Sequence, residues 1–493
     1  MPPYNIDNHE NVIIGLEAHC QLTTLETKLF CDCSADYRGK EPNSLVCPVC
    51  LGLPGSLPVP NRRAVEFAIM VALALKSKVS SRSLFFRKNY YYPDMPKNFQ
   101  ISQYDKSGGV PIAVGGSISF RVDGKKRKVE IQRIQIEEDP AKLVYPGTID
   151  ASPYTLVDYN RAGITLLEIV TKPHLKSPQE ARAFLQKLRS ILEHLEVSNG
   201  NLEGAMRCDA NISLTGSDRV EVKNISSFKD VERALKFEVT RQKSLLARGK
   251  RITLETRHWD DAKRVTVSLR SKEEEHDYRY FPEPDLAPVV VSNELIDKVK
   301  ASMPELPDSR RDRFISSYGL PLYDSEVLTS DKSLADFFEK CTELGGDAKK
   351  VSNWLMTDFL RWLREEDADI TKSRATPQHL VEMVGLIDDG TISGKIGKSV
   401  LKTMIKTGKT AVEIVKTEGL LRIASAREIK RIVDRVVKEN PNAVQDALKD
   451  EKNVNFLIGQ LMKITRGKAD PELSNSLMRE KLETIRQKRT GEG

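Results

Sequence analysis

The amino-acid sequence predicts an α+β protein in which a mainly antiparallel sheet is followed by an all-α region. Up to about residue 290, short apolar runs alternate with period two and are separated by Gly, Pro and Asn, a pattern typical of half-buried strands. After the proline-rich segment 281–288, apolar residues recur at helical spacing. A chain of 493 residues is also too long for one hydrophobic core. We therefore expect three domains, over residues 1–292, 293–410 and 411–493.

Predicted strands in the first domain carry polar side chains on one face. Glu17 and His19 alternate with apolar residues in the run 12–19. Arg207, Asp209 and Asn211 do the same in the run 206–214. Because side chains two positions apart on a strand point to the same side, each set is expected to line a cleft. A further strand, 129–136, ends at three consecutive acids, which are Glu137, Glu138 and Asp139.

Helices are predicted both within and after this region. Residues 177–195 and 228–248 have helical spacing and are expected to pack on one side of the sheet. Gly390, Gly394 and Gly397 predict a break between two helical subdomains. Apolar stripes of the helical part comprise Val351, Leu355, Phe359, Trp362 and Leu363 in one segment, and Ile429, Ile432, Val433 and Val436 in another.

The composition is that of a globular protein, with 39% hydrophobic and 30% charged residues. No apolar run approaches the ~18 residues of a membrane span, and residues 1–10 lack the apolar segment of a signal peptide. We therefore expect a cytoplasmic protein without membrane contact. The net charge is +7, and residues 391–493 hold 22 Lys and Arg against 13 Asp and Glu, so the positive charge is concentrated in the tail.

Four of the seven cysteines are clustered within residues 31–50. The pair Cys31 and Cys33 precedes the pair Cys47 and Cys50, and two such thiolate pairs can bind one tetrahedral Zn²⁺. Four thiolates leave no open coordination position, so the zinc is expected to hold a knuckle-like loop rather than to take part in catalysis. The alternative is four unliganded cysteines.

Acidic residues in or beside the apolar runs predict a Mg²⁺ site. Hard divalent cations bind carboxylate oxygens, and phosphoryl transfer from ATP requires such cations. For any single acid, solubility of a surface strand is the alternative explanation. The sequence contains neither a P-loop nor a G-x-G-x-x-G motif, so a nucleotide is expected in a sheet-lined cleft. The acids are Glu17, Glu137, Glu138, Asp139, Asp158, Glu168, Asp209 and Glu221, and nearby basic residues include Arg87, Lys88, Lys97, Lys142, Arg161, Arg207 and Lys223.

Several longer motifs carry a resemblance to a known family. They are IGLEAH (14–19), CPVCLGLPGS (47–56), KNYYYPD (88–94), EED (137–139), DYNRAG (158–163), RCDAN (207–211), EVKN (221–224) and DYRYFPEPD (277–285). Taken together and in this order, they closely resemble the GatB family, the B subunits of tRNA-dependent amidotransferases. The sister E subunits carry an inserted domain, for which there is no room between Leu286 and Gly390.

This resemblance implies a fold, a reaction and partners. The fold would be a cradle domain of the glutamine synthetase and guanido kinase type, then a helical domain and a YqeY-like tail that binds tRNA. The complex would be a heterotrimer in which the amidase GatA releases ammonia from glutamine and GatC clamps it to this chain. ATP would activate the carboxylate of Glu-tRNA(Gln) or Asp-tRNA(Asn) as an acyl phosphate, and ammonia would displace the phosphate.

The resemblance also assigns roles to residues. Glu17, His19, Glu137 and Glu138 would bind Mg²⁺, and Cys31, Cys33, Cys47 and Cys50 would bind a structural Zn²⁺. Residues expected to serve the reaction itself are Lys88, Asp94, Arg161, Arg207, Asp209 and Lys223.

Two other functions fit part of the sequence. A zinc-stabilised tRNA-binding scaffold would explain the cysteines and the basic tail, but not the acidic sheet faces. A free-standing ATP-dependent amide ligase that uses free ammonia and a small acid would not need the tail.

Overall fold

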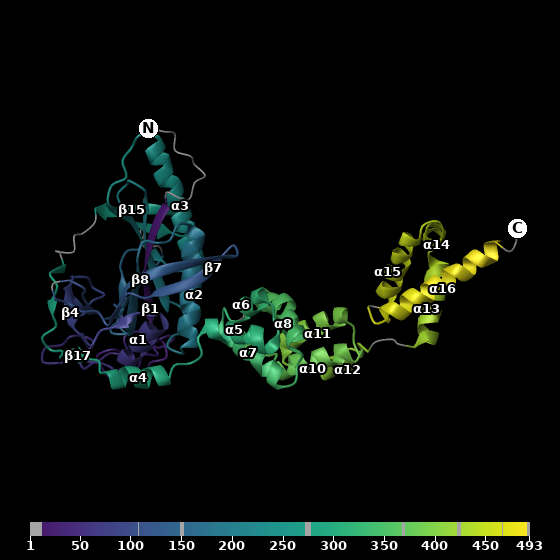
Figure 1. Ribbon diagram of the computed structural model, residues 1–493, viewed down its shortest axis with the longest axis horizontal. Coiled ribbons are helices and arrows are strands. Elements are labelled where there is room, and N and C mark those ends of the chain that lie inside the picture. The colour runs from purple at the N-terminus through teal and green to yellow at the C-terminus, as the bar shows by residue number, and fades with distance from the viewer. Residues whose placement is uncertain are drawn as a thin grey trace. The chain divides into compact units, whose positions relative to one another are not determined.

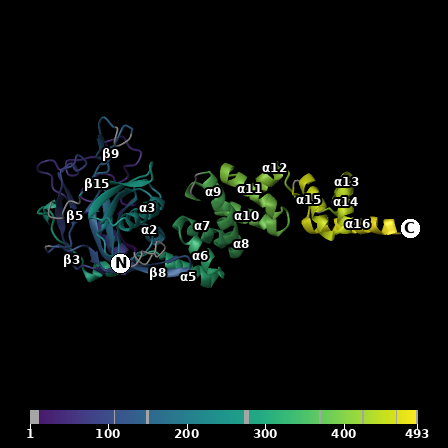
Figure 2. The ribbon, with the colours of Figure 1, turned by 90° about the horizontal axis from the view of Figure 1, so that it is seen from above.

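The structure is a computed structural model that describes residues 12–106, 108–147, 152–271, 278–366, 370–421, 425–465 and 467–490. The chain forms two compact units, Met1–Ser309 and Arg310–Gly493. Figures 1 and 2 show strands concentrated in the first unit and helices alone in the second. The predicted α+β class, with the sheet first and the helices after it, is confirmed.

The first unit is built on a sheet of ten strands within the described ranges. Their order is β15-β14-β13-β12-β1-β11-β8-β6-β2, and β7 pairs with β8. Every pair is antiparallel except β13 with β14. The strands are β1 (Val12–Gln21), β2 (Lys78–Val79), β6 (Ala113–Val114), β7 (Ser117–Val122), β8 (Lys125–Glu138), β11 (Thr165–Thr171), β12 (Met206–Leu214), β13 (Val220–Ile225), β14 (Glu255–Asp260) and β15 (Val265–Ser271).

Three small sheets border the large one. The sheet β16-β4-β5 consists of Phe281–Pro282, Phe85–Asn89 and Phe99–Gln103. The pair β10-β9 consists of Leu156–Asp158 and Lys142–Val144, and the pair β17-β3 of Val289–Val290 and Arg82–Ser83. The three-stranded sheet matters most for the site, because β4 carries Lys88 and β5 contacts β8.

Helices α2 (Pro178–His194) and α3 (Phe228–Ala247) pack against each other and against strands of the large sheet. Both predicted helices are therefore confirmed. Each begins where a serine side chain accepts a backbone N–H, Ser177 for α2 and Ser227 for α3, as N-caps do. Helices α1 (Arg62–Ala74) and α4 (Asn293–Ala301) complete the first core, which extends past residue 292 because Val299 is buried in it.

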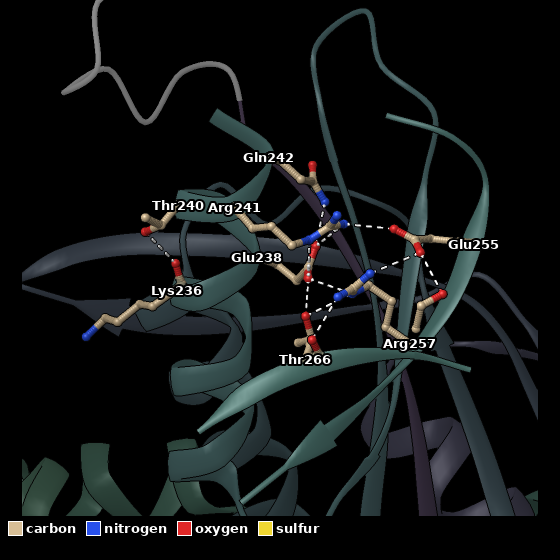
Figure 3. A network of polar contacts seen from close by, with 9 residues as sticks. Lys236, Glu238, Thr240, Arg241, Gln242, Glu255, Arg257 and Thr266 are labelled. Carbon is tan, nitrogen blue, oxygen red and sulfur yellow. Dashed lines mark hydrogen bonds and ion pairs between the residues drawn. The ribbon is translucent and has the colours of Figure 1, made fainter. Parts of the chain in front are cut away.

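A buried ion-pair network joins α3 to the edge of the sheet (Figure 3). Glu238 on α3 is fully buried and accepts hydrogen bonds from Arg241 at two oxygens, each at 2.9 Å. Arg257 on β14 approaches the same carboxylate at 3.2 Å, and the hydroxyl of Thr266 on β15 donates to it. A buried carboxylate needs such partners, so this network holds β14 and β15 in place beside β13.

The second unit contains helices with two separate apolar cores. The first of these cores includes residues of α5 (Pro307–Tyr318), α6 (Leu322–Leu328), α7 (Lys332–Glu343), α8 (Ala348–Trp354), the π-helix η3 (Leu355–Phe359), α9 (Leu360–Glu365), α10 (Pro377–Asp388), α11 (Gly394–Thr407) and α12 (Ala411–Thr417). The other includes residues of α13 (Ala426–Glu439), α14 (Pro441–Lys449), α15 (Val454–Ile464) and α16 (Pro471–Thr490). Two short 3₁₀ turns are η4 (Ile370–Lys372) and η5 (Glu451–Asn453).

Most residues of the predicted apolar stripes are buried, whereas Trp362 and Ile432 are half-buried, and one stripe contains a π-helix. Val351, Leu355, Phe359 and Leu363 recur every four residues and are all buried. A helix with 3.6 residues per turn would rotate such a stripe steadily away from its contact. The π-helix η3 widens the turn at this point, which keeps the stripe on one side.

The predicted break at the three glycines is wrong. Helices α10 and α11 flank Gly390 and share one core. Gly390 has a positive φ of 76° and lies just after α10. Gly397 lies inside α11, where an added Cβ would be 2.7 Å from Ile387 and 3.2 Å from Trp354. These glycines therefore serve a turn and a close helix contact.

None of the helices in the described ranges has both the length and the apolar character needed to cross a membrane.

Candidate active site and metal centres

Strand β1 brings the predicted polar residues together. It pairs with β12 on one side, where Glu17 lies opposite Asp209 and His19 opposite Arg207. It pairs with β11 on the other side, where His19 lies opposite Glu168. Directly opposed side chains on neighbouring strands are about 5 Å apart at Cβ, so the three strands form one polar surface.

Two side chains of this surface, together with Glu137 of the neighbouring strand β8, lie close enough to hold a single cation. One atom each of His19, Glu137 and Glu168 lies within 4.8 Å of the other two. The Nε2 of His19 is 3.7 Å from Oε1 of Glu137. A Mg²⁺ ion with ligands at about 2.1 Å spans atoms up to about 4 Å apart, so small side-chain movements would complete the site. Glu17 stands beside it and accepts a hydrogen bond from Asn211 at 2.8 Å.

The concentration of acids changes their protonation. Burial, reinforced by the charge of Glu137, raises the pKa of Glu168 to about 7, although His19 and Arg133 oppose the shift. Burial also raises the pKa of Asp209, against the opposing effect of Lys223. The metal-free cluster therefore resists full ionisation, and a bound cation would relieve this repulsion.

Cationic side chains face the acids. Burial lowers the pKa of Lys88, but the negative charge of nearby groups, including Glu137 and Glu168, raises it more, and the net pKa lies above the usual value. The ammonium of Lys88 is 5.0 Å from the ring centre of Tyr278. Lys223 lies 3.6 Å from Asp209 and 3.4 Å from Glu221.

Arg207 is held by a buried carboxylate. Its Nη2 donates to Oδ1 of Asp139 at 2.7 Å, and Asp139 also accepts a hydrogen bond from Gln21 at 2.6 Å. The side chain of Asp139 is fully buried. Attraction to Asp139 is the main reason why the pKa of Arg207 is raised, so this guanidinium stays charged in the cleft.

A cleft with a volume of about 2130 Å³ is lined by the acids and cations described above, apart from the buried Asp139. Pockets for one small ligand usually measure about 300 to 1,000 Å³, so this cleft is larger than the usual site for one small ligand. Its lining includes most of the predicted site residues, which are Glu17, His19, Lys88, Asp94, Glu137, Arg207, Asp209 and Lys223. Burial raises the pKa of Asp94 within it.

Apart from the four clustered cysteines, two predicted site residues are not brought to the cleft surface. Glu138 follows Glu137 on β8, so its side chain points to the other side of the strand and pairs with Lys97 at 2.5 Å. Arg161 donates to the backbone carbonyls of Pro140 and Ala141, at 2.8 and 2.6 Å. Both lie outside the described lining of the cleft.

One member of the cluster, Glu168, and one residue that contacts it, Arg133, are predicted neither as metal ligands nor as catalytic residues. Glu168 is among the predicted acids but not among the predicted ligands, and Arg133 is in neither set. Arg133 lies 3.5 Å from Glu168 and 3.3 Å from Asp105. Period-two spacing back from Glu137 along β8 gives Gln135 and Arg133, so the parity rule alone would have found Arg133.

The four clustered cysteines also converge. Their sulfur atoms all lie within 4.8 Å of one another, which fits the separations in a tetrahedral thiolate site with Zn–S bonds of about 2.3 Å. The backbone N–H of Cys47 donates to Sγ of Cys50 at 3.1 Å, and the buried ammonium of Lys28 lies 3.8 Å from the same sulfur. Such donors stabilise thiolate over thiol, so the donor set suits a metal ion.

Comparison with known proteins gives consistent matches. A family model described as the GatB/GatE catalytic domain matches residues 12–297, and one described as the GatB domain matches residues 336–482. The chain is 52% identical to the B subunit of the aspartyl/glutamyl-tRNA(Asn/Gln) amidotransferase of Sulfolobus acidocaldarius, over 96% of this chain and 99% of that protein. It is 49% identical to the protein of the same name from Thermotoga maritima, over 96% of this chain and 98% of that protein.

The raised pKa of Glu168 predicts a pH dependence of stability in the metal-free chain. Its pKa is about 7 in the fold, against about 4.3 when unfolded. Between these values the folded state holds more protons, so the contribution of Glu168 to the free energy of unfolding falls as pH rises. Denaturant unfolding with EDTA at several pH values should show this fall. The free energy of unfolding of Glu168→Gln should change less with pH. Parallel pH profiles for the two proteins would contradict the raised pKa of Glu168.

The cysteine geometry predicts about one zinc per chain by elemental analysis. Cys33→Ser should lose most of this zinc, since Cys33 belongs to the cluster. The control is Cys208→Ser, which changes a buried cysteine outside the cluster and should keep the metal. Purified chain without stoichiometric zinc would rule out the zinc site.

Proposed function

The chain belongs to the GatB/GatE family and is a B-type subunit of a tRNA-dependent amidotransferase, a ligase, and on that premise we propose that it activates the carboxylate of Glu-tRNA(Gln) or Asp-tRNA(Asn) with ATP so that ammonia can convert it to an amide. The observation that carries this proposal is the single cleft in which the cluster of His19, Glu137 and Glu168 faces Lys88, Arg207 and Lys223.

The first step of the proposed reaction brings together two anions, the carboxylate on the tRNA and ATP. A carboxylate oxygen attacks the γ-phosphorus of ATP, the bond from that phosphorus to the β-phosphate oxygen breaks, and ADP leaves. Ammonia then attacks the acyl carbon, the bond to the phosphate oxygen breaks, and phosphate leaves with the proton that the nitrogen loses, which gives the amide. Mg²⁺ bound by His19, Glu137 and Glu168, with Glu17 beside them, would supply positive charge to the phosphates.

The cations of the cleft have complementary tasks in this scheme. Lys88 and Lys223 line the cleft and would attract phosphate oxygens, because an ammonium stabilises the charge of a transferring phosphoryl group. Arg207, fixed by Asp139, offers a rigid guanidinium to the same charge. Asp209 would either act as a further ligand or orient ammonia. Arg161 would instead fix the backbone after Asp139 through its two carbonyl contacts.

Ammonia is proposed to come from a partner subunit. The cysteines outside the cluster are Cys20, Cys208 and Cys341, and all three are buried. Burial raises the pKa of Cys20 and of Cys341 to about 12, and burial also raises the pKa of Cys208. Such thiols are poor nucleophiles, so glutamine hydrolysis would fall to an amidase subunit, GatA, with GatC holding the complex together.

The test of the proposed function uses the chain with ATP and Glu-tRNA(Gln), with and without ammonium. We expect ADP formation that depends on the charged tRNA, and amide formation only when ammonium is present. Amidation of free glutamate would instead support a small-acid ligase. Binding of tRNA without any ATP turnover would support a scaffold.

Removing a cluster residue should abolish activation. His19→Ala or Glu137→Ala should lower ATP-dependent amidation by more than about 100-fold, since changes outside the direct ligands already cost 10–100-fold. Binding of tRNA in a filter assay should persist. The control is Glu130→Ala, which changes an acid on the same strand that pairs with Lys172 at 2.7 Å. Near-normal amidation by both cluster variants would refute the metal assignment.

The basic tail is proposed to bind the tRNA body. Helix α13 exposes Arg427, Arg431 and Lys438, and phosphate contacts give affinity that depends on salt but not on sequence. Changing all three to Gln should weaken tRNA binding and reduce the slope of log K against log salt by about 0.7 to 0.9 for each phosphate that is no longer neutralised. Asp434→Asn with Glu439→Gln on the same helix is the control. An unchanged salt series for the triple variant would make the tail a structural appendage.

A further inference from the structure

Glu138 and Glu137 are adjacent on β8 but belong to different environments. Glu137 faces the cleft, where Ser102 donates to its Oε2 at 3.2 Å. The side chain of Glu138 is 2% exposed, and its Oε2 is 2.5 Å from the ammonium of Lys97. Its Oε1 accepts the backbone N–H of Ile101 at 2.8 Å. Glu138 therefore binds one group just before β5 and one within it.

The segment that carries the four cysteines and continues to Gly52 (residues 31–52), here called the cysteine loop, covers this ion pair. Gly52, two residues after Cys50, has a φ of 66°, and a Cβ added to it would be 2.2 Å from Cγ of Lys97. The loop backbone thus lies directly on the Lys97 side chain, which is 9% exposed. On the far side, a Cβ built on Gly163 would be 3.6 Å from Cβ of Cys50 and 3.9 Å from Oε2 of Glu138.

Strand β5 connects the pair to the cleft. Gln100 donates to the backbone carbonyl of Glu138 at 2.7 Å, and the hydroxyl of Ser102 donates to Glu137. Because β5 is tied to both glutamates, the orientation of Glu137 depends on the position of β5. That position depends in turn on the contacts that Glu138 makes to Lys97 and Ile101.

We propose that the Lys97–Glu138 ion pair is a positioning link through which the cysteine loop holds Glu137 at the metal cluster. Glu138 is then a positioning residue and not a metal ligand. The link rests on the proposed function only in that the cluster is taken to bind the divalent cation of the reaction. Loss of either charge leaves the other buried and unpaired, which a folded protein avoids by moving the group. Such a movement would shift β5 and loosen the loop together.

The experiment is a double-mutant cycle on the full chain with Lys97→Met, Glu138→Gln and the double variant. Two measurements do not depend on catalysis. The first is the affinity for Mn²⁺, from the decrease of the electron paramagnetic resonance signal of free Mn²⁺. The second is the rate at which zinc is transferred to a colorimetric chelator. Glu137→Gln is the reference for loss of a ligand. Glu180→Gln on α2 is the matched control, because Glu180 is also a mostly buried glutamate, paired with Arg127 at 2.7 Å.

We expect each single variant to weaken Mn²⁺ binding by about tenfold and to release zinc faster, while the control changes neither. The double variant should lose no more than either single variant, because all three lack the same ion pair. Mn²⁺ binding by Lys97→Met that is as tight as in the wild type, with Glu138→Gln as weak as Glu137→Gln, would make Glu138 a ligand and overturn the proposal. Unchanged Mn²⁺ affinity in all three would also overturn it. Failure of the wild-type chain to amidate tRNA would count only against the proposed function.

Discussion

Antiparallel pairing of β1 with both β11 and β12 determines which side chains can meet in the cleft. Every second residue of β1 is buried against the core, among them Leu16 and Ala18, and the polar residues Glu17 and His19 lie on the opposite face. A slip of one residue would move Glu17 and His19 into the core and the apolar side chains into the cleft. The cost of burying unpaired polar groups therefore selects the register, and the register assembles the site.

The same pairing brings several carboxylates close together, and their mutual repulsion favours binding of the cation that the proposed reaction needs. Acids from β1, β8 and β11 are closer together than their charges favour, and the pKa of Glu168 rises to about 7 as a result of burial and of Glu137. Cations from other elements, Lys88 on β4 and Lys223 on β13, moderate but do not remove this strain. Binding of a divalent cation stabilises a site of this kind, because the cation offsets the repulsion between the carboxylates. The cation would then bring the anionic substrates to a surface that otherwise repels them.

Much of this arrangement could be predicted from sequence, because strand parity and helix periodicity are local properties. Parity alone places Glu17 with His19 on one strand face, and Asp209 with Arg207 on another. The pairing between those strands is not local, and neither is the position of Lys88, which reaches the cleft from a separate small sheet. Local patterns do not specify which strands become neighbours.

Other residues show the limits of sequence patterns. Successive residues of a strand point to opposite faces, so strand parity alone predicts that Glu138 and Glu137 lie on different sides of β8. The family resemblance nevertheless assigns both residues to the metal. The role of Arg161 depends on two carbonyls that only the tertiary structure brings to its guanidinium. The glycines at 390 and 397 looked like a domain break because a glycine in a turn and a glycine in a close helix contact have the same sequence signal.

The β1 register is proposed to build one divalent-cation site from His19, Glu137 and Glu168. Anomalous diffraction at the manganese edge, from crystals soaked with Mn²⁺ and a non-hydrolysable ATP analogue, tests it most directly. We expect a strong anomalous peak within bonding distance, about 2.2 Å, of all three side chains. A peak on the Glu138 side of β8, or a cleft without any peak at saturating Mn²⁺, would contradict it.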